Sequence, residues 1–140
     1  MKRIHIVSLL FAGLVSVLGA FAVAQDAPLE VTEILMGTTI ESGVPTSPTT
    51  SFSRSDPSLY CMVRFRNRTG AEGHIRIAFE QAGEDAPTPG ARGRRFSFPA
   101  SRRYRTVSRG TPNRAAGSYR CVVRTDEGAV LSHQDFTITE

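Results

Sequence analysis

The sequence predicts an all-β protein, a single antiparallel β-sandwich of seven to eight strands that follows an N-terminal signal peptide. Apolar and polar residues alternate with period two in several short runs, and residues that favour turns separate these runs. After residue 25, no helical pattern is longer than two turns. The two cysteines fall within such runs, as a bridge between two packed sheets requires.

Residues 1–24 have the three parts of a secretory signal peptide. Lys2 and Arg3 form the positive start, Ile4–Ala20 is almost wholly apolar, and Ala22–Ala24 supplies the small residues that a signal peptidase needs. We therefore expect an exported protein that is periplasmic or secreted.

An uncleaved membrane anchor is the alternative, because Ile4–Ala24 is just long enough to cross a bilayer, which takes about 20 apolar residues. Polar chain begins immediately at Gln25, which favours cleavage, so contact with the membrane is expected only if the segment stays in place. After cleavage we expect a short linker over 25–28 and one β-sandwich domain over 29–140. A chain of this size can form one hydrophobic core.

The alternation predicts eight strands. Two segments between them, Gly43–Ser58 with its Ser, Thr and Pro residues and Gly83–Gly93 with its Gly, Pro and Ala residues, are predicted to be loops. The predicted strands are 29–36, 38–41, 59–66, 74–80, 94–98, 103–108, 118–124 and 129–138.

Both cysteines lie on the apolar faces of their predicted strands, Cys61 in 59–66 and Cys121 in 118–124. The opposite face of the first of these strands carries Tyr60, Met62, Arg64 and Arg66. An oxidising compartment favours a structural disulfide between the two cysteines. A thiol catalyst is the alternative, but it needs a free cysteine beside a base, and nothing in the sequence marks either residue in that way.

The segment Gly117–Cys121 resembles the start of strand F in immunoglobulin-type domains, in which a tyrosine precedes the second cysteine by two residues, as Tyr119 does. Such domains commonly place a core tryptophan after the first cysteine, but Ile75 occupies that position and the chain has no tryptophan. We therefore expect a general immunoglobulin-like sandwich rather than an antibody-like domain.

Short motifs along nearly the whole mature chain resemble the uncharacterised bacterial family called "domain of unknown function" twenty-nine fourteen. The resemblance implies a domain associated with the bacterial envelope, without an assigned activity, and it draws attention to His74, Tyr104 and Ser108. The matching segments are Gly37–Ile40 with Pro45, Leu59–Asn67, Gly73-His74, Tyr104–Ser108, Gly117–Val123 and Glu127–Leu131 with Phe136.

The sequence contains no motif that indicates catalysis, and we expect no enzymatic activity, no cofactor and no metal ion. His74 and His133 have no metal-ligand spacing to another residue, and there is no nucleophile elbow or phosphate-binding loop. His74 falls on the outer face of its predicted strand, where a histidine is usually solvated. A hydrolase is a remote alternative that rests on His74 near Arg105 and Ser108 in the resembled pattern.

Charge is strongly segregated along the chain. Residues 86–125 contain ten arginines and no acidic residue, whereas residues 26–85 and 126–140 each carry a net charge of −4. We interpret Arg102, Arg103 and Arg105 as a candidate anion-binding site, because guanidinium groups form bidentate pairs with carboxylate and phosphate. Solvated arginines, or arginines paired internally with acidic residues on neighbouring strands, are the alternative.

The leading hypothesis is a non-enzymatic binding or interaction module of the cell envelope that presents its arginine-rich strands to an anionic partner. Export makes nucleic acid an unlikely partner and favours anionic glycan, anionic lipid or an acidic protein. The second hypothesis is a structural accessory subunit that docks by a sheet edge or by the outer apolar residues Tyr60, Met62 and Val122.

Overall fold

The computed structural model of the protein describes residues 28–83 and 93–140, which form ten strands. The predicted signal peptide at 1–24, most of the linker at 25–28 and most of the predicted loop Gly83–Gly93 lie outside the described residues. The strands are β1 (Leu29–Gly37), β2 (Ile40–Glu41), β3 (Val44–Pro45), β4 (Ser51–Ser53), β5 (Leu59–Asn67), β6 (Gly73–Gln81), β7 (Arg94–Phe98), β8 (Arg103–Gly110), β9 (Gly117–Thr125) and β10 (Val130–Thr139).

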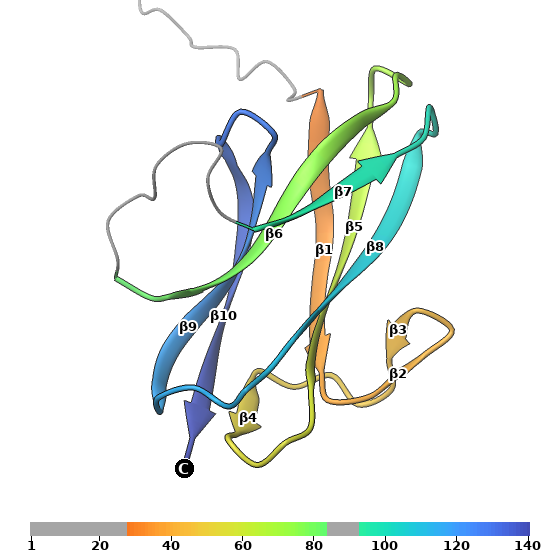
Figure 1. Ribbon diagram of the computed structural model, residues 1–140. Coiled ribbons are helices and arrows are strands. Elements are labelled where there is room, and N and C mark those ends of the chain that lie inside the picture. The colour runs from red at the N-terminus through yellow and green to blue at the C-terminus, as the bar shows by residue number, and fades with distance from the viewer. Residues whose placement is uncertain (1–27, 84–92) are drawn as a thin grey trace, which may run out of the picture.

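The strands form two packed sheets, as predicted for an immunoglobulin-like sandwich (Figure 1). One sheet has three strands in the order β1-β5-β8, and the other has five in the order β4-β10-β9-β6-β7. The short strands β2 and β3 form a separate hairpin. Within the described residues there is no helix that could cross a membrane.

One part of the prediction was wrong, because the predicted loop Gly43–Ser58 contains β3 and β4. Strand β4 pairs with β10 in parallel, so one edge of the otherwise antiparallel sandwich is mixed. Only Phe52 of β4 is buried, and a run of three residues is too short to reveal a period of two. The other predicted strands end within two residues of the observed ones.

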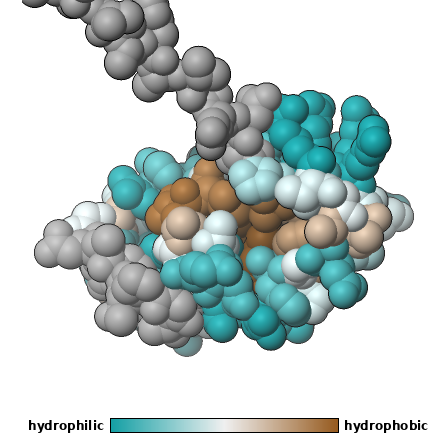
Figure 2. All heavy atoms as spheres, turned by 90° about the horizontal axis from the view of Figure 1, so that it is seen from above, coloured by the Kyte–Doolittle hydropathy of each residue, from teal (hydrophilic) through white to brown (hydrophobic). Residues whose placement is uncertain are grey.

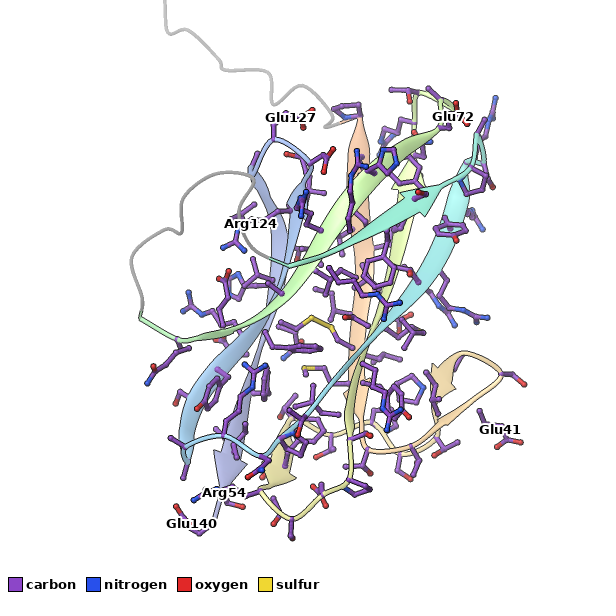
Figure 3. All side chains as sticks on the ribbon, viewed as in Figure 1. Glu41, Arg54, Glu72, Arg124, Glu127 and Glu140 are labelled. Carbon is purple, nitrogen blue, oxygen red and sulfur yellow. A yellow bond between two sulfur atoms is a disulfide. The ribbon has the colours of Figure 1, made fainter. Side chains whose placement is uncertain are left out.

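The two cysteines join the sheets, which confirms the predicted disulfide. Cys61 on β5 and Cys121 on β9 are bonded with their Cα atoms 6.7 Å apart, and both side chains are fully buried. The bridge lies between the sheets in the interior of the sandwich (Figure 3). Figure 2 shows the molecule from the end at which β9 turns into β10. In this view hydrophobic residues lie in the middle of the molecule, and hydrophilic residues lie around them.

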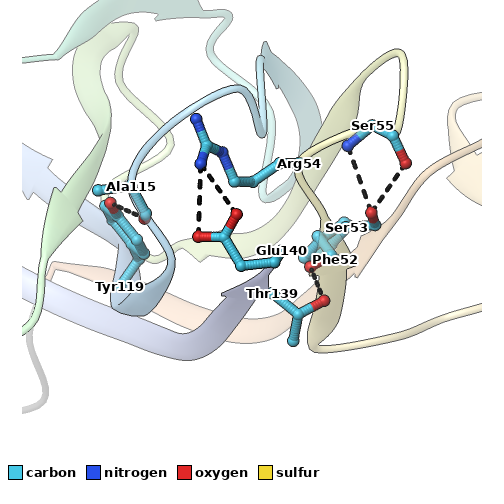
Figure 4. A network of polar contacts seen from close by, with 8 residues as sticks. All are labelled: Phe52, Ser53, Arg54, Ser55, Ala115, Tyr119, Thr139 and Glu140. Carbon is cyan, nitrogen blue, oxygen red and sulfur yellow. Dashed lines mark hydrogen bonds and ion pairs between the residues drawn. The ribbon is translucent and has the colours of Figure 1, made fainter.

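Tyr119 fixes the start of β9. Its hydroxyl donates a hydrogen bond of 2.6 Å to the carbonyl oxygen of Ala115, four residues upstream (Figure 4). Its ring stacks on Phe136 with the centroids 5.7 Å apart. This is the tyrosine corner of immunoglobulin-like domains. Ile75, at the position where such domains commonly have tryptophan, is buried in the core.

Two of the three apolar residues predicted to lie on the outside are buried, which corrects that part of the docking hypothesis. Met62 is 0% exposed and Val122 is 4% exposed, whereas Tyr60 is half-buried. The β2–β3 hairpin folds back so that β3 contacts β1 and β5, and Pro45 packs against Gly37, which pairs with Tyr60 of β5. Val122 lies between Ala78 of β6 and His133 of β10 in the five-stranded sheet.

We expect the Cys61→Ala/Cys121→Ala variant to lose about 4 kcal/mol of unfolding free energy, because the bond closes a loop with a sequence separation of 60 residues and restricts the unfolded chain. Urea denaturation measures the loss. Intact mass before and after reduction should differ by two protons, and two alkylated thiols in the unreduced protein would contradict the bridge.

We expect Tyr119→Phe to lower the unfolding free energy by about 1–2 kcal/mol, because the ring is kept but the carbonyl of Ala115 loses its hydrogen-bond donor. Tyr60→Phe is the matched control, since the Tyr60 hydroxyl makes no hydrogen bond within the described residues. Equal denaturation midpoints for the two variants would show that the tyrosine corner contributes nothing measurable.

Candidate functional site

The outer face of the three-stranded sheet carries a cluster of four arginines. The antiparallel register of β5 and β8 places Arg64 opposite Arg105 and Arg66 opposite Arg103. Because paired residues point to the same side of a sheet and residues two apart share a face, all four side chains leave the same surface. We call this surface, formed by Arg64, Arg66, Arg103 and Arg105, the arginine face.

Little negative charge compensates the arginine face. Arg64 Nε lies 3.4 Å from Glu33 Oε2, whereas Arg66, Arg103 and Arg105 form no ion pair within the described residues. The pairing register shifts between Val31 and Glu33, so a β-bulge moves Glu33 opposite Arg64. Glu30 lies opposite Arg66 and pairs with Arg68, so the four arginines and two glutamates leave this surface with a net charge of +2.

The β2–β3 hairpin closes one end of the arginine face. Ser42 and Gly43 connect its strands with φ angles of 51° and 75°, as a two-residue type I′ turn requires. The carbonyl oxygen of Ser42 accepts a hydrogen bond of 3.0 Å from Arg105 Nη2. A Cβ atom at Gly43 would lie 3.1 Å from the same nitrogen, so the turn holds the Arg105 guanidinium closely.

Arg102 lies at the other end of the arginine face, immediately before β8. Its carbonyl oxygen accepts a hydrogen bond of 2.8 Å from the backbone N–H of Asn67, which joins the ends of β5 and β8. Arg68 follows Asn67 in the chain, and its Nη2 lies 2.8 Å from Glu30 Oε2 in an ion pair. The predicted site residues Arg102, Arg103 and Arg105 are therefore neighbours, although Arg102 stands at the edge of the face.

Two adjoining depressions lie along the arginine face. The larger, of about 580 Å³, is lined by the four residues of the arginine face together with Thr32, Glu33, Phe65 and Tyr104. The smaller, of about 400 Å³, is lined by Arg66, Asn67, Arg68, Arg102 and Arg103. Because both include Arg66 and Arg103, the depressions form one continuous path along the strands.

The sequence alone did not assign Arg64 and Arg66 to this site. Alternation had placed them on the outer face of their strand, but they belong to a part of the chain with excess acidic residues. Only the pairing of β5 with β8 brings them beside the basic segment. Alternation alone predicts that the arginines of both strands face outward. It does not predict that the two strands are neighbours, or which residues lie opposite each other.

Most arginines of the five-stranded sheet have carboxylate partners, unlike most of those on the arginine face, and Arg94 instead lies over the ring of Phe96. Arg124, which is 6% exposed, forms two hydrogen bonds of 2.6 and 2.8 Å with the carboxylate of Glu80 (Figure 3 labels Arg124). Arg120 pairs with Asp135 at 2.9 Å. The predicted internal pairing with acidic residues therefore describes this sheet.

Asp126 joins two further arginines of the five-stranded sheet. Its carboxylate accepts hydrogen bonds of 3.0 and 2.7 Å from Arg95 and one of 3.1 Å from Arg76. These arginines, with Arg95 the stronger influence, hold the pKa of the Asp126 carboxyl below its ordinary value of 3.8. The same carboxylate raises the pKa of Arg95.

The structure does not bring together the residues on which the hydrolase alternative rests. His74 lies on the outer face of β6, opposite Ser97 of β7, whereas Ser108 is 2% exposed and lies on the inner face of β8 opposite Cys61. Tyr104 packs against Phe65 with ring centroids 5.4 Å apart. The described residues contain no cluster of three or more potential metal ligands.

Comparison with known proteins finds no matching family model and no matching curated protein. Two solved structures share 12% sequence identity with the chain. A beta-glucosidase from Listeria innocua in complex with glucose has a TM-score of 0.48, over 80% of this chain and 16% of that one. A beta-glucosidase from Kluyveromyces marxianus has a TM-score of 0.45, over 77% of this chain and 14% of that one. No activity follows from likeness of this extent.

We expect Asp126→Asn to lower the urea midpoint at pH 7, because it removes the carboxylate that Arg95 and Arg76 share. The folded-state pKa of Asp126 is lowered. Its ionised carboxylate therefore contributes to the unfolding free energy above the ordinary pKa of 3.8, and this contribution is lost as the pH falls through the folded-state pKa. The midpoints of variant and wild type should therefore converge in strong acid. Glu127→Gln is the control, and a difference that persists unchanged in strong acid would refute the ion-pair explanation.

Proposed function

We propose that this protein is an exported, non-enzymatic binding module of the bacterial cell envelope, which holds an anionic partner on its arginine face. The observation that carries the proposal is the pair of like-charged contacts Arg64–Arg105 and Arg66–Arg103 across two neighbouring strands. Like charges directly opposite each other destabilise a sheet by a few tenths of a kcal/mol to about 1 kcal/mol. A bound anion between the paired arginines would attract both guanidinium groups, so each pair would stabilise the sheet instead of destabilising it.

The chemistry of the guanidinium group supports a carboxylate or phosphate as the ligand. Its planar fork donates two parallel hydrogen bonds to such a group, and charge-assisted bonds of this kind are roughly twice as strong as neutral ones. Arg66 and Arg103 have these donors unused within the described residues. The ion pairs of the five-stranded sheet, in contrast, already use the donors of Arg124 and Arg95.

Export is supported by the signal-peptide pattern at 1–24 and is compatible with the disulfide, which persists in oxidising compartments. The two alternatives have less support. Burial of Met62 and Val122 removes most of the apolar surface on which an accessory subunit would dock. Separation of His74 and Ser108 on different sheets removes the arrangement on which a hydrolase would depend.

Binding to purified peptidoglycan and purified lipopolysaccharide tests the proposal by co-sedimentation. We expect the variant Arg66→Ala/Arg103→Ala/Arg105→Ala to bind at least about 10-fold more weakly, because each charge-assisted hydrogen bond contributes roughly 1.5–3 kcal/mol. Wild-type binding should also weaken steeply between low salt and about 0.15 M ionic strength.

The matched control is Arg54→Ala/Arg95→Ala/Arg120→Ala, which removes the same charge from arginines that have carboxylate partners elsewhere, such as Glu140 for Arg54 (Figure 4). If both triple variants lose binding equally, net charge rather than the arginine face is responsible. If neither loses binding, the arginine face is not the site.

A further inference from the structure

The arginines of the proposed site form a ladder that runs along the strands. Arg64 with Arg105 makes the first tier, and Arg66 with Arg103 makes the second. Arg68, two residues after Arg66, and Arg102, one residue before Arg103, lie just beyond the strand ends, where both line the smaller depression, and we count them as the third tier. Because residues two apart on a strand are about 7 Å apart, the first two tiers lie at about that distance from each other.

We propose that this ladder binds a linear polyanion, a chain that carries one phosphate or carboxylate in each repeat and lies along β5 and β8. The proposal rests on the proposed anion-binding function and specifies the form of the ligand. The two guanidinium groups of one tier are enough to bind a single phosphate or carboxylate, and the Cα atoms of the next tier lie about 7 Å further along the strands. A chain of anionic groups engages all three tiers at once.

The placement of the carboxylates supports binding along the whole ladder. Glu33 pairs with Arg64 in the first tier. Glu30 lies opposite Arg66 in the register of β1 and β5, but its carboxylate pairs with Arg68 in the third tier. Within the described residues, Arg66 and Arg103 of the middle tier form no ion pair, so both guanidinium groups are available in the centre of the path, where both depressions meet. An extended ligand must cross this centre to bridge the two ends.

The shape of the site favours a flexible chain over a lipid surface. The tiers line a depression along the sheet, and the Ser42–Gly43 turn closes one end by its contact with Arg105. A flat layer of lipid headgroups would touch the rim of such a depression rather than its floor. A narrow chain can follow the floor from the hairpin to the open end at Arg102.

The aromatic residues near the ladder favour a polyanion without bases. Single-stranded nucleic acids bind proteins largely by stacking bases on exposed aromatic rings. Phe65 and Tyr104 alternate with the arginines along β5 and β8, so both rings leave the opposite side of the sheet, where Phe65 is 2% exposed and Tyr104 packs against it. Neither ring lies on the arginine face, so an acidic polysaccharide or a polyol phosphate fits the site better.

Calorimetric titration with oligomers of defined length tests the ladder. The probes are galacturonic acid and its linear oligomers, with inorganic phosphate and linear polyphosphates as a second series that separates carboxylate from phosphate recognition. In at least one series, we expect affinity to rise about 10-fold or more from the monomer to oligomers that span three tiers and then to level off, because added groups bind at high effective concentration.

The salt dependence gives a second readout. Counterion release makes the logarithm of the affinity for a polyanion fall linearly with the logarithm of salt concentration, and each contact adds roughly one to the slope. Arg66→Ala/Arg103→Ala should reduce this slope by about two, whereas Arg54→Ala/Arg120→Ala should leave it unchanged. Circular dichroism and urea midpoints establish that both variants remain folded.

The outcomes separate the two proposals. If monomer and long oligomers bind with equal affinity, and the Arg66→Ala/Arg103→Ala variant loses this binding, the ladder is wrong but the anion-binding site stands. Binding to vesicles of phosphatidylglycerol, or to oligothymidylate, without binding to either oligomer series would also overturn the ladder. Absence of binding to every anionic probe would overturn the ladder and the proposed function together.

Discussion

The disulfide between Cys61 and Cys121 is the constraint on which the arrangement of the molecule depends. It joins β5, the central strand of one sheet, to β9, the central strand of the other. A bridge at the centre of both sheets fixes which face of each strand is turned inward. Every second residue of β5 is thereby turned outward, and the arginines of β5 become part of the surface.

The two sheets treat arginine differently. On the five-stranded sheet, neighbouring strands and turns supply carboxylates, so Glu80, Asp126 and Asp135 neutralise the arginines beside them. On the three-stranded sheet, β5 lies between β1, which contributes Glu30 and Glu33, and β8, which contributes further arginines. The charge segregation of the sequence therefore becomes a charged surface on one side and a network of ion pairs on the other.

Small irregularities shape the arginine face. The bulge in β1 places the Glu33 carboxylate opposite Arg64, and the turn at Ser42 and Gly43 holds Arg105 at the closed end. Both features lie outside the strand pair that carries the four arginines. The resemblance to a bacterial family of unknown function stays a prediction beside these observations.

Period-two alternation is a local property of each strand, so the all-β class, the cysteine pairing and the inner and outer faces of the long strands could all be predicted from the sequence. It missed β4, whose three residues show no period and whose partner β10 lies more than 80 residues away in the chain. The sequence indicated Arg102, Arg103 and Arg105 from the basic segment but left out Arg64 and Arg66. Only the tertiary structure decided that choice, because strand register depends on contacts between distant segments, and the register places arginine opposite arginine.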